Sequence, residues 1–171
     1  MSVTAQNILR ILWILLGAGI ALFLALEVVR PQDSALLIAS LGGSALFLFG
    51  LTASPSTQPR ALFGGHLIGA LIGVIAYQLF GDATWVMIAS VAITIAALLL
   101  TKTVHPPAGA NPLIMIHSHA GLIDIWTHVF AGVLVMAITT FVWSRMGPGN
   151  TRYPVNWNQK SPESSNWGPW A

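Results

Sequence analysis

The residues best suited to chemistry lie in one short run, from Lys102 to Pro112. The run holds a lysine, a histidine directly before two prolines, a glycine and an asparagine. Proline is tolerated in the first turn of a helix, so Pro106 and Pro107 predict the start of a short helix. The free N–H groups of that first turn, together with the helix dipole, would favour an anion. The alternative interpretation is a tight loop whose residues only fix geometry.

Further polar side chains could join this run. The long apolar stretches of the chain contain no Asp or Glu, but they do contain histidines and hydroxyls. A histidine within a membrane span is costly unless it faces a cavity or a partner, and it titrates near neutrality. Proton-coupled anion transport is therefore one option. The candidate pathway residues are Ser40, Gly43, Ser44, Arg60, His66, Lys102, Thr103, His105, Gly109, Asn111 and His128.

The pattern His117-Ser118-His119 raises the alternative of a metal site, with His105 and His128 as further ligands. However, the sequence has no cysteine and no His-Glu-x-x-His pattern, and Asp124 is the carboxylate near this cluster. A zinc or copper site needs three or four converging ligands. We therefore expect no metal and no other cofactor, and we expect His117 and His119 to lie in a hydrated loop.

The composition indicates a membrane protein. Of the 171 residues, 55% are hydrophobic and 7% are charged, and the mean hydropathy is +0.75. Soluble domains average about a quarter charged residues, so this chain cannot cover a water-facing surface. The net charge is +2 without a basic stripe, which argues against nucleic-acid binding. The sequence also lacks a P-loop pattern, which argues against a built-in ATP motor.

Charged residues divide the chain into six apolar segments, and about 20 apolar residues are needed to cross a bilayer as a helix. Two segments are weaker, because one contains Gly42-Gly43-Ser44 and the other is broken by prolines. Backbone broken at membrane depth must be buried in protein or line a wet cavity, so a pathway is expected there. The predicted fold class is an all-α polytopic membrane protein. Its four long transmembrane helices are expected at 11–26, 61–81, 83–101 and 125–144, and its two short or broken segments at 34–52 and 103–123.

The basic residues indicate an orientation. If all six segments cross, every Lys and Arg except Arg30 falls on one side, and the positive-inside rule places that side, with both termini, in the cytoplasm. If the second and fifth segments instead re-enter and leave on one side, Arg30, Arg60 and Lys102 lie outside and the bias mostly vanishes, so we favour six crossings. Because no transit segment precedes the first span, we expect an integral protein of a bacterial inner membrane. Residues 1–145 form the membrane domain and 146–171 a cytoplasmic Pro- and Trp-rich tail. The tail is either loose, with its tryptophans at the membrane interface, or a plug or subunit contact.

The two halves of the chain are similar in pattern. Each has a long apolar helix, a weak segment, and then a long helix with a histidine near its start, His66 or His128. Inverted three-helix repeats would place a transport site near the midplane; chance similarity between apolar helices is the other interpretation. Gly65, Gly69 and Gly73 predict close helix packing rather than a direct pore role. Oligomerisation would bury such faces, and we expect a homo-oligomer.

At Thr103–Ala110 the sequence resembles the HPP family of small integral membrane proteins. The resemblance extends to Ser40–Ala45, Ser54-Pro55, Gln58–Arg60 and Gly64–His66, covers roughly 31–143 and excludes the tail from Met146. One departure is Asn111-Pro112, where the family pattern has a small residue and no proline. The family is described as having four membrane spans, and members are linked to nitrite movement in chloroplasts and cyanobacteria. The resemblance therefore implies a channel or secondary transporter for a small inorganic anion, with nitrite as the substrate.

Three other functions are compatible with these residues. One is a pore for a neutral small solute such as ammonia, formed by paired histidines. Another is a membrane enzyme with a histidine-bound metal, although we expect no enzyme activity. The third is a structural subunit of a larger complex. Neutralising Arg60 or Lys102 should impair anion transport but should barely affect a neutral pore. The expected partners are nitrite, the lipid bilayer and further copies of the chain.

Overall fold

The computed structural model of the chain describes residues 3–30, 35–147 and 151–164. Within these ranges the protein is helical and contains no strand, apart from an isolated bridge between Thr103 and Ser161. Four helical stretches are long and apolar enough to cross a membrane. They are α1 (Val3–Val29), α3 (Pro59–Phe80), α4 (Thr84–Thr101), and the continuous run of α6 (Leu122–Asp124), η4 (Ile125–Phe130) and α7 (Ala131–Met146). The prediction of four long helices is confirmed.

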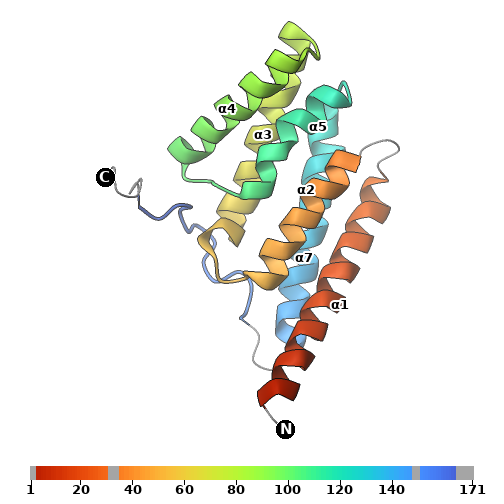
Figure 1. Cartoon of the computed structure of the whole chain (residues 1–171), viewed down its shortest axis with the longest axis vertical. Helices are drawn as coiled ribbons and strands as arrows, with labels where there is room; N and C mark the ends of the chain where they lie inside the picture. Colours follow the sequence, from red (N-terminus) through yellow and green to blue (C-terminus); the bar gives the residue numbers. More distant parts are fainter. Residues whose placement is uncertain (1–2, 31–34, 148–150, 165–171) are drawn as a thin grey trace.

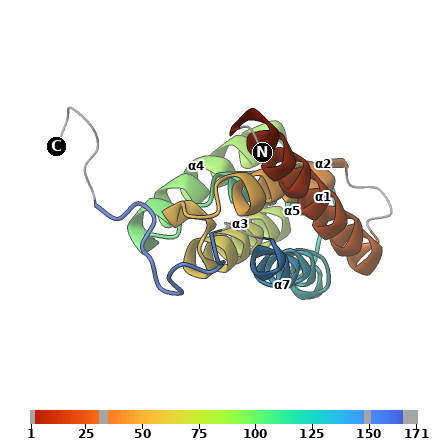
Figure 2. The same ribbon diagram turned by 90° about the horizontal axis from the view of Figure 1, so that it is seen from below.

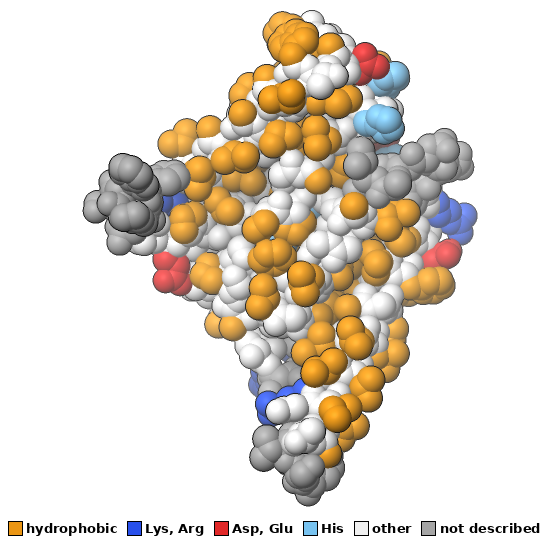
Figure 3. All heavy atoms as spheres, viewed as in Figure 1, with side chains coloured by type: hydrophobic (Ala, Val, Ile, Leu, Met, Phe, Trp, Pro, Cys, Tyr) orange, Lys and Arg blue, Asp and Glu red, His pale blue; other side chains and the backbone are white. Residues whose placement is uncertain are grey.

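The outer surface of these helices is apolar. Large hydrophobic side chains are widely exposed, among them Leu100 at 84% and Ile88 at 67%. Figure 3 shows hydrophobic side chains spread over the face viewed, with charged side chains near its edges. A water-soluble protein does not leave so much contiguous apolar surface uncovered. The helices are therefore suited to contact with lipid.

The second apolar segment is a shorter helix, as predicted. It consists of α2 (Ala35–Ala45) followed directly by the π-helical turn η1 (Leu46–Gly50). The chain then turns through η2 (Pro55–Thr57) into α3. Thr57 Oγ1 donates to the carbonyl of Leu51 at 3.0 Å, which closes this turn. Pro59 occupies the first turn of α3, where its missing N–H leaves no helical hydrogen bond unmade.

The fifth segment is broken, and its prolines open a short helix as predicted. After α4, an extended stretch leads to η3 (Pro106–Ala110), a 3₁₀ turn, and then to α5 (Asn111–His117). His105 is extended, with φ −125° and ψ 107°, as expected for a residue before proline. At 1.5 Å per residue, α5 alone is about 10 Å long, far less than a bilayer core of about 30 Å. This segment must therefore be held by its neighbours.

A row of glycines on α3 holds the broken segment. A Cβ at Gly69 would lie 2.7 Å from the carbonyl oxygen of Ala108, and a Cβ at Gly73 would lie 2.6 Å from Cα of Pro112. At Gly65 it would lie 2.9 Å from the carbonyl oxygen of Thr103. The backbone of the broken segment thus lies directly against α3. The prediction that these glycines serve packing is confirmed, and the structure identifies what they pack against.

The helices alternate in direction along the chain. Figure 1 shows α1 rising from the N-terminus, α2 descending beside it, and α3, α4, α5 and α7 continuing this alternation. The N-terminus and the end of α7 consequently lie at the same end of the molecule. The most extensive helix contacts are those of α1 with α7 and of α3 with α5, followed by that of α3 with α4. Six alternating passes, the fifth of half length, are the arrangement that the charge pattern predicts.

The described part of the tail lies against the membrane domain. The buried Tyr153 accepts a 2.7 Å hydrogen bond on its carbonyl from Arg145 of α7. Val155 N–H donates to Gln58 Oε1 at the start of α3, and Ser161 N–H donates to the carbonyl of Lys102 at the end of α4. Figure 2 shows this path from α7 across the end of α3 toward α4. Residues 151–164 are thus docked rather than loose, while Trp167 and Trp170 lie outside the described residues.

Candidate functional site

Five of the predicted site residues come together in the interior. We call Ser40 and Ser44 of α2, His66 of α3, His105 before η3 and Asn111 of α5 the polar cluster. None of these five residues is more than 2% exposed. The two broken segments and α3 meet here, because Gly43 lets Pro107 approach α2. A Cβ added at Gly43 would lie 3.1 Å from Cγ of Pro107.

Ser44 is the centre of the polar cluster. Its hydroxyl lies 3.0 Å from Nε2 of His66 and 3.0 Å from Nε2 of His105. It also lies 3.0 Å from the carbonyl oxygen of Ser40, one turn earlier in α2. The two imidazole rings are close to one another, with centroids 5.1 Å apart. A single hydroxyl therefore joins two histidines that come from different parts of the chain.

Asn111 connects the three elements that form the site. Its Nδ2 lies 2.9 Å from the carbonyl oxygen of His66 and 2.9 Å from Nδ1 of the same residue. Its Oδ1 accepts a hydrogen bond from Ser40 Oγ at 3.1 Å. The carbonyl oxygen of His66 can only accept, so the amide must turn its Nδ2 toward it, which fixes the orientation of the amide. The asparagine that departs from the family pattern is thus fully used in hydrogen bonding.

The hydrogen-bonding partners also fix the tautomers of the two histidines. Asn111 Nδ2 can only donate, so Nδ1 of His66 accepts and the ring proton of neutral His66 lies on Nε2. Nδ1 of His105 lies 2.6 Å from the carbonyl oxygen of Ser56, which can only accept, so this nitrogen carries a proton. Neutral His105 therefore presents an unprotonated Nε2 to Ser44. The two rings are not equivalent.

Four further predicted residues lie along the segment that carries His105. Arg60 Nη2 donates to the carbonyl of Thr101 at 2.8 Å, and Arg60 Nε donates to that of Lys102 at 3.4 Å. Lys102 ends α4 in the left-handed conformation, with φ 56°. The buried Thr103 hydroxyl lies 2.7 Å from that of Thr101. Arg60, Lys102 and Thr103 thus fix the chain just before His105, whereas Gly109 has open space where a side chain would be.

His128 does not join the polar cluster. Its Nδ1 lies 3.2 Å from Asp124 Oδ1, one turn earlier, and its side chain is 37% exposed. The matched positions of His66 and His128 in the two halves therefore do not correspond to matched surroundings. The π-helical turn η4 places the His128 side chain beside Asp124 instead of in the interior.

The remaining histidines are exposed, with His117 at the end of α5 and His119 in the turn that follows, so the predicted hydrated loop holds for His119. His117 and His119 are exposed, and His119 Nε2 lies 3.0 Å from Asp82 Oδ2 in the α3–α4 turn. Hydrogen bonding from His119 lowers the pKa of the Asp82 carboxyl below its ordinary value. Among the described residues, no three His, Cys, Asp or Glu side chains converge in a way that could hold a metal ion.

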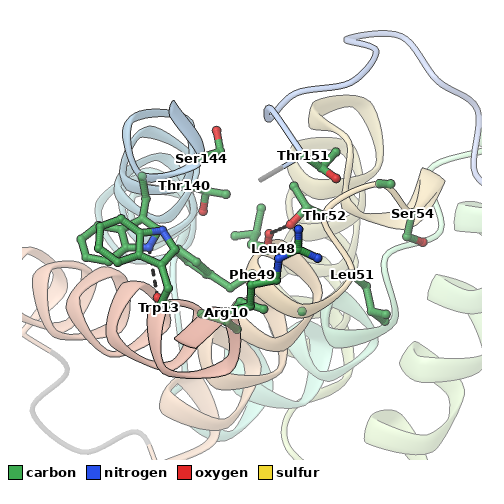
Figure 4. Close-up of a pocket in the computed structure, with 14 residues that line it drawn as sticks. Arg10, Trp13, Leu48, Phe49, Leu51, Thr52, Ser54, Thr140, Ser144 and Thr151 are labelled. Carbon is green, nitrogen blue, oxygen red and sulfur yellow. Dashed lines mark hydrogen bonds between the residues drawn. The ribbon is translucent and has the colours of Figure 1, made fainter. Parts of the chain in front are cut away.

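A cavity of about 430 Å³ lies between α1, η1, α7 and the beginning of the docked tail. Its polar lining includes Arg10, Trp13, Thr52, Thr140, Ser144 and Thr151. Figure 4 shows the Arg10 side chain reaching across the cavity toward Thr52. Leu48 also lines it, one helical turn after Ser44 of the polar cluster, and so does Ser54, two residues before Ser56, whose carbonyl lies beside His105. The cavity therefore adjoins the part of α2 and η1 that carries the site.

Sequence reasoning missed two parts of this arrangement. The carbonyl of Ser56 determines the state of His105, but a backbone acceptor leaves no mark in residue types. The cavity beside Arg10 depends on the way α1 packs against α7, which apolar periodicity does not specify. The Ser54-Pro55 turn is part of the family resemblance, and it was the available signal for the position of the Ser56 carbonyl.

A polytopic α-helical membrane protein with a buried polar cluster between two broken segments is the class that this geometry defines. The chain belongs to the HPP family: residues 3–154 match the family described as "HPP, transmembrane region". The match includes the beginning of the tail, which the sequence resemblance had excluded.

Two relatives are transmembrane proteins of the amoeba Dictyostelium discoideum. One is 29% identical over 85% of this chain and 54% of its own length, and the other is 31% identical over 83% of this chain and 48% of its own length. The chain thus spans about half the length of these relatives. No solved structure matches the chain.

Proposed function

We propose that this protein moves a small inorganic anion across the membrane, and that nitrite is its substrate. The polar cluster is the observation that carries the proposal. It gathers hydroxyl, amide and imidazole groups in the interior of an apolar helical protein, and no carboxylate hydrogen bonds to it within the described residues. Polar and ionisable groups are rare inside membrane proteins and mark substrate pathways when they occur. The nitrite assignment comes from the family resemblance.

The donor set suits an anion. Ser40, Ser44 and the amide of Asn111 each provide a donor, and neutral His66 provides the N–H of its Nε2, whereas the N–H of neutral His105 faces the carbonyl of Ser56. A small oxyanion accepts hydrogen bonds at its oxygens, and it would be repelled by fixed negative charge. Hydrogen bonds to a charged acceptor are shorter and stronger than those between neutral groups. A dry site with several donors can therefore replace part of the hydration shell of the anion.

The proposed route joins the cavity to the polar cluster. Ser44 precedes the cavity-lining Leu48 by one helical turn, about 6 Å at 1.5 Å per residue. Leu48 is fully buried and separates the two. The members of the polar cluster contact one another directly, so an anion reaches them only when α2 moves apart from η3 and α5. Broken segments are suited to such movement, because few helical hydrogen bonds hold them.

Nitrite uptake into liposomes that contain only the purified protein tests the proposal. Protein-free liposomes run in parallel measure the nitrous acid that crosses lipid without help. Uptake above this background is the expected result. Uptake of labelled methylammonium without uptake of nitrite would instead indicate a pore for neutral amines. No uptake of either solute, in protein shown to be folded and inserted, would contradict transport by this chain alone.

A further inference from the structure

We infer that His105 takes up one proton with each anion, so that the polar cluster carries an anion and a proton together. This inference rests on the proposed function and names the coupling ion for the same site. The argument comes from the hydrogen-bonding capacity of Ser44, whose hydroxyl has one hydrogen to donate and two lone pairs that accept. Its three neighbours at 3.0 Å are His66 Nε2, His105 Nε2 and the carbonyl oxygen of Ser40.

With both histidines neutral, the three contacts cannot all be satisfied. His66 donates from Nε2, because its Nδ1 accepts from Asn111. His105 carries its proton on Nδ1, toward the carbonyl of Ser56, so its Nε2 needs a donor. The carbonyl of Ser40 is the other acceptor within reach of the Ser44 hydroxyl, in addition to the helical N–H of Ser44 that it accepts within α2. The Ser44 hydroxyl has one hydrogen for these two acceptors. The acceptor that does not receive it faces a lone pair of Ser44 Oγ at 3.0 Å.

One added proton on Nε2 of His105 makes hydrogen bonds of all three contacts of the Ser44 hydroxyl. The imidazolium then donates to Ser56 through Nδ1 and to Ser44 through Nε2, while Ser44 donates to Ser40. The two lone pairs of Ser44 accept from the two histidines. His66 cannot take the proton in this arrangement, because a second N–H at its Nδ1 would point at the donor of Asn111. The geometry therefore selects His105 over His66.

The surrounding charges explain why the proton needs an anion. The charged or titratable side chains on the elements around His105 are His66, Arg60 and, toward the far end, Tyr77 on α3, His117 at the far end of α5, and Lys102 on its own segment; the docked tail adds Arg152, Tyr153, Lys160 and Glu163. The described parts of α2, η1, η2 and η3 add none. A buried imidazolium without a counter-ion is costly. An anion in the polar cluster supplies that counter-ion, so each ion favours the binding of the other.

The proton balance is simple. The lone pair on Nε2 of His105 forms an N–H bond with a proton from water on the side where the anion binds, and the Ser44 hydrogen turns to the carbonyl of Ser40. No covalent bond within the protein breaks. On the opposite side this N–H bond breaks, the proton returns to water, and the anion leaves with it. One proton and one monovalent anion cross together, so the cycle moves no net charge.

Simultaneous records of nitrite uptake and internal pH in liposomes test this inference. A trapped pH dye should report one proton per nitrite above the protein-free background, and a potassium diffusion potential should not alter the rate. In His105→Gln the ratio of protons to nitrite should fall toward zero, whereas His66→Gln should keep the ratio at a reduced rate. His119→Gln, an exposed loop histidine, is the matched control and should resemble the wild type. Nitrite uptake that follows the potential and moves no protons would overturn the inference and leave the proposed function intact.

A binding experiment gives a readout that does not depend on flux. Nitrogen-15 NMR of the detergent-solubilised protein distinguishes imidazole from imidazolium at each ring. Addition of nitrite should convert the His105 signal, and not the His66 signal, to the imidazolium form. Binding of nitrite without this change would overturn the inference. If neither binding nor uptake occurs, the proposed function fails and the inference fails with it.

Discussion

Nε2 of His105 lies 3.0 Å from the hydroxyl of Ser44, although the two residues are 61 positions apart in the sequence. The contact joins the two segments that are too short or too broken to cross a bilayer as regular helices. Neither segment could leave its polar groups at membrane depth without a partner. Each supplies the partner of the other, and α3 completes the arrangement through His66. The site and the fold therefore depend on the same contact.

Ser44→Ala should abolish most of the transport while leaving the protein inserted. The change removes the acceptor of His66 Nε2 and the partner of His105 Nε2 in one step. An unsatisfied buried polar group costs about 1–3 kcal/mol, and a rise of about 1.4 kcal/mol in the transport barrier corresponds to about a tenfold slower rate. Nitrite uptake into liposomes, normalised to folded protein, measures the effect.

Ser90→Ala is the control for this substitution. Ser90 is also a buried serine of a membrane helix, but its hydroxyl donates only to the carbonyl of Val86 within α4, at 2.7 Å. Its removal should leave uptake near the wild-type rate. Equal losses in the two variants would show that any buried serine matters for stability and would remove Ser44 from the pathway.

Most of the fold could be predicted from the sequence. The long apolar stretches between charges locate α3, α4 and the run that ends in α7 within about three residues, whereas α1 begins at Val3, well before the predicted start at residue 11. Pro106 and Pro107 locate the beginning of the short helix, because proline is favoured in a first turn. These features depend on local composition. The docking of the tail depends on contacts such as Gln58 to Val155, which are far apart in sequence, and nothing local indicates them.

The candidate site could be predicted in its membership but not in its geometry. The residue types singled out Ser40, Ser44, His66, His105 and Asn111, and the structure brings all five together. The same reasoning also selected His128, because pattern similarity between the halves cannot show which way a side chain points. The protonation pattern follows from donors and acceptors at defined distances, which only the folded chain provides.

Gly69→Ala should destabilise the membrane domain. The added Cβ would lie 2.7 Å from the backbone oxygen of Ala108, so α3 and η3 would have to separate. Overpacking of this kind costs about 1–3 kcal/mol. Gly19→Ala is the control, since nothing lies within 4 Å of its added Cβ. Thermal unfolding in detergent should show a lower midpoint for Gly69→Ala alone. An unchanged midpoint would mean that the broken segment is not held by this contact.

Arg10→Gln should slow nitrite uptake more at low ionic strength than at high. Arg10 lines the cavity that adjoins the polar cluster, and its charge would raise the local concentration of an anion. Salt screens such an effect, with a Debye length of about 10 Å at 0.1 M. Arg30→Gln is the control, because the exposed Arg30 follows α1 at its opposite end. Equal losses for Arg10→Gln at both ionic strengths would argue against electrostatic attraction by the cavity.

Tyr153→Phe should keep the tail docked and should extend docking to higher pH. The Tyr153 phenol is buried, its oxygen has no hydrogen-bond partner among the described residues, and burial raises its pKa. Docking free energy is therefore fully present below the ordinary tyrosine pKa of about 10, and it is lost as the pH rises toward the raised value, because the undocked tail can ionise. Each pH unit in this window shifts the equilibrium about tenfold toward the undocked tail. The phenylalanine variant lacks this dependence.

The absence of cysteine from the sequence makes this prediction measurable. Trp157 is 62% exposed, so Trp157→Cys provides a single labelling site on the tail with little disturbance. A spin label at this position should become mobile above a pH of about 10 in the protein that retains Tyr153. In the Tyr153→Phe protein it should stay immobile over the same pH range. Tyr153→Ala should mobilise the label at neutral pH, because it removes the anchor itself. A label that is mobile in all three proteins at neutral pH would show that the tail does not dock against α3 and α7.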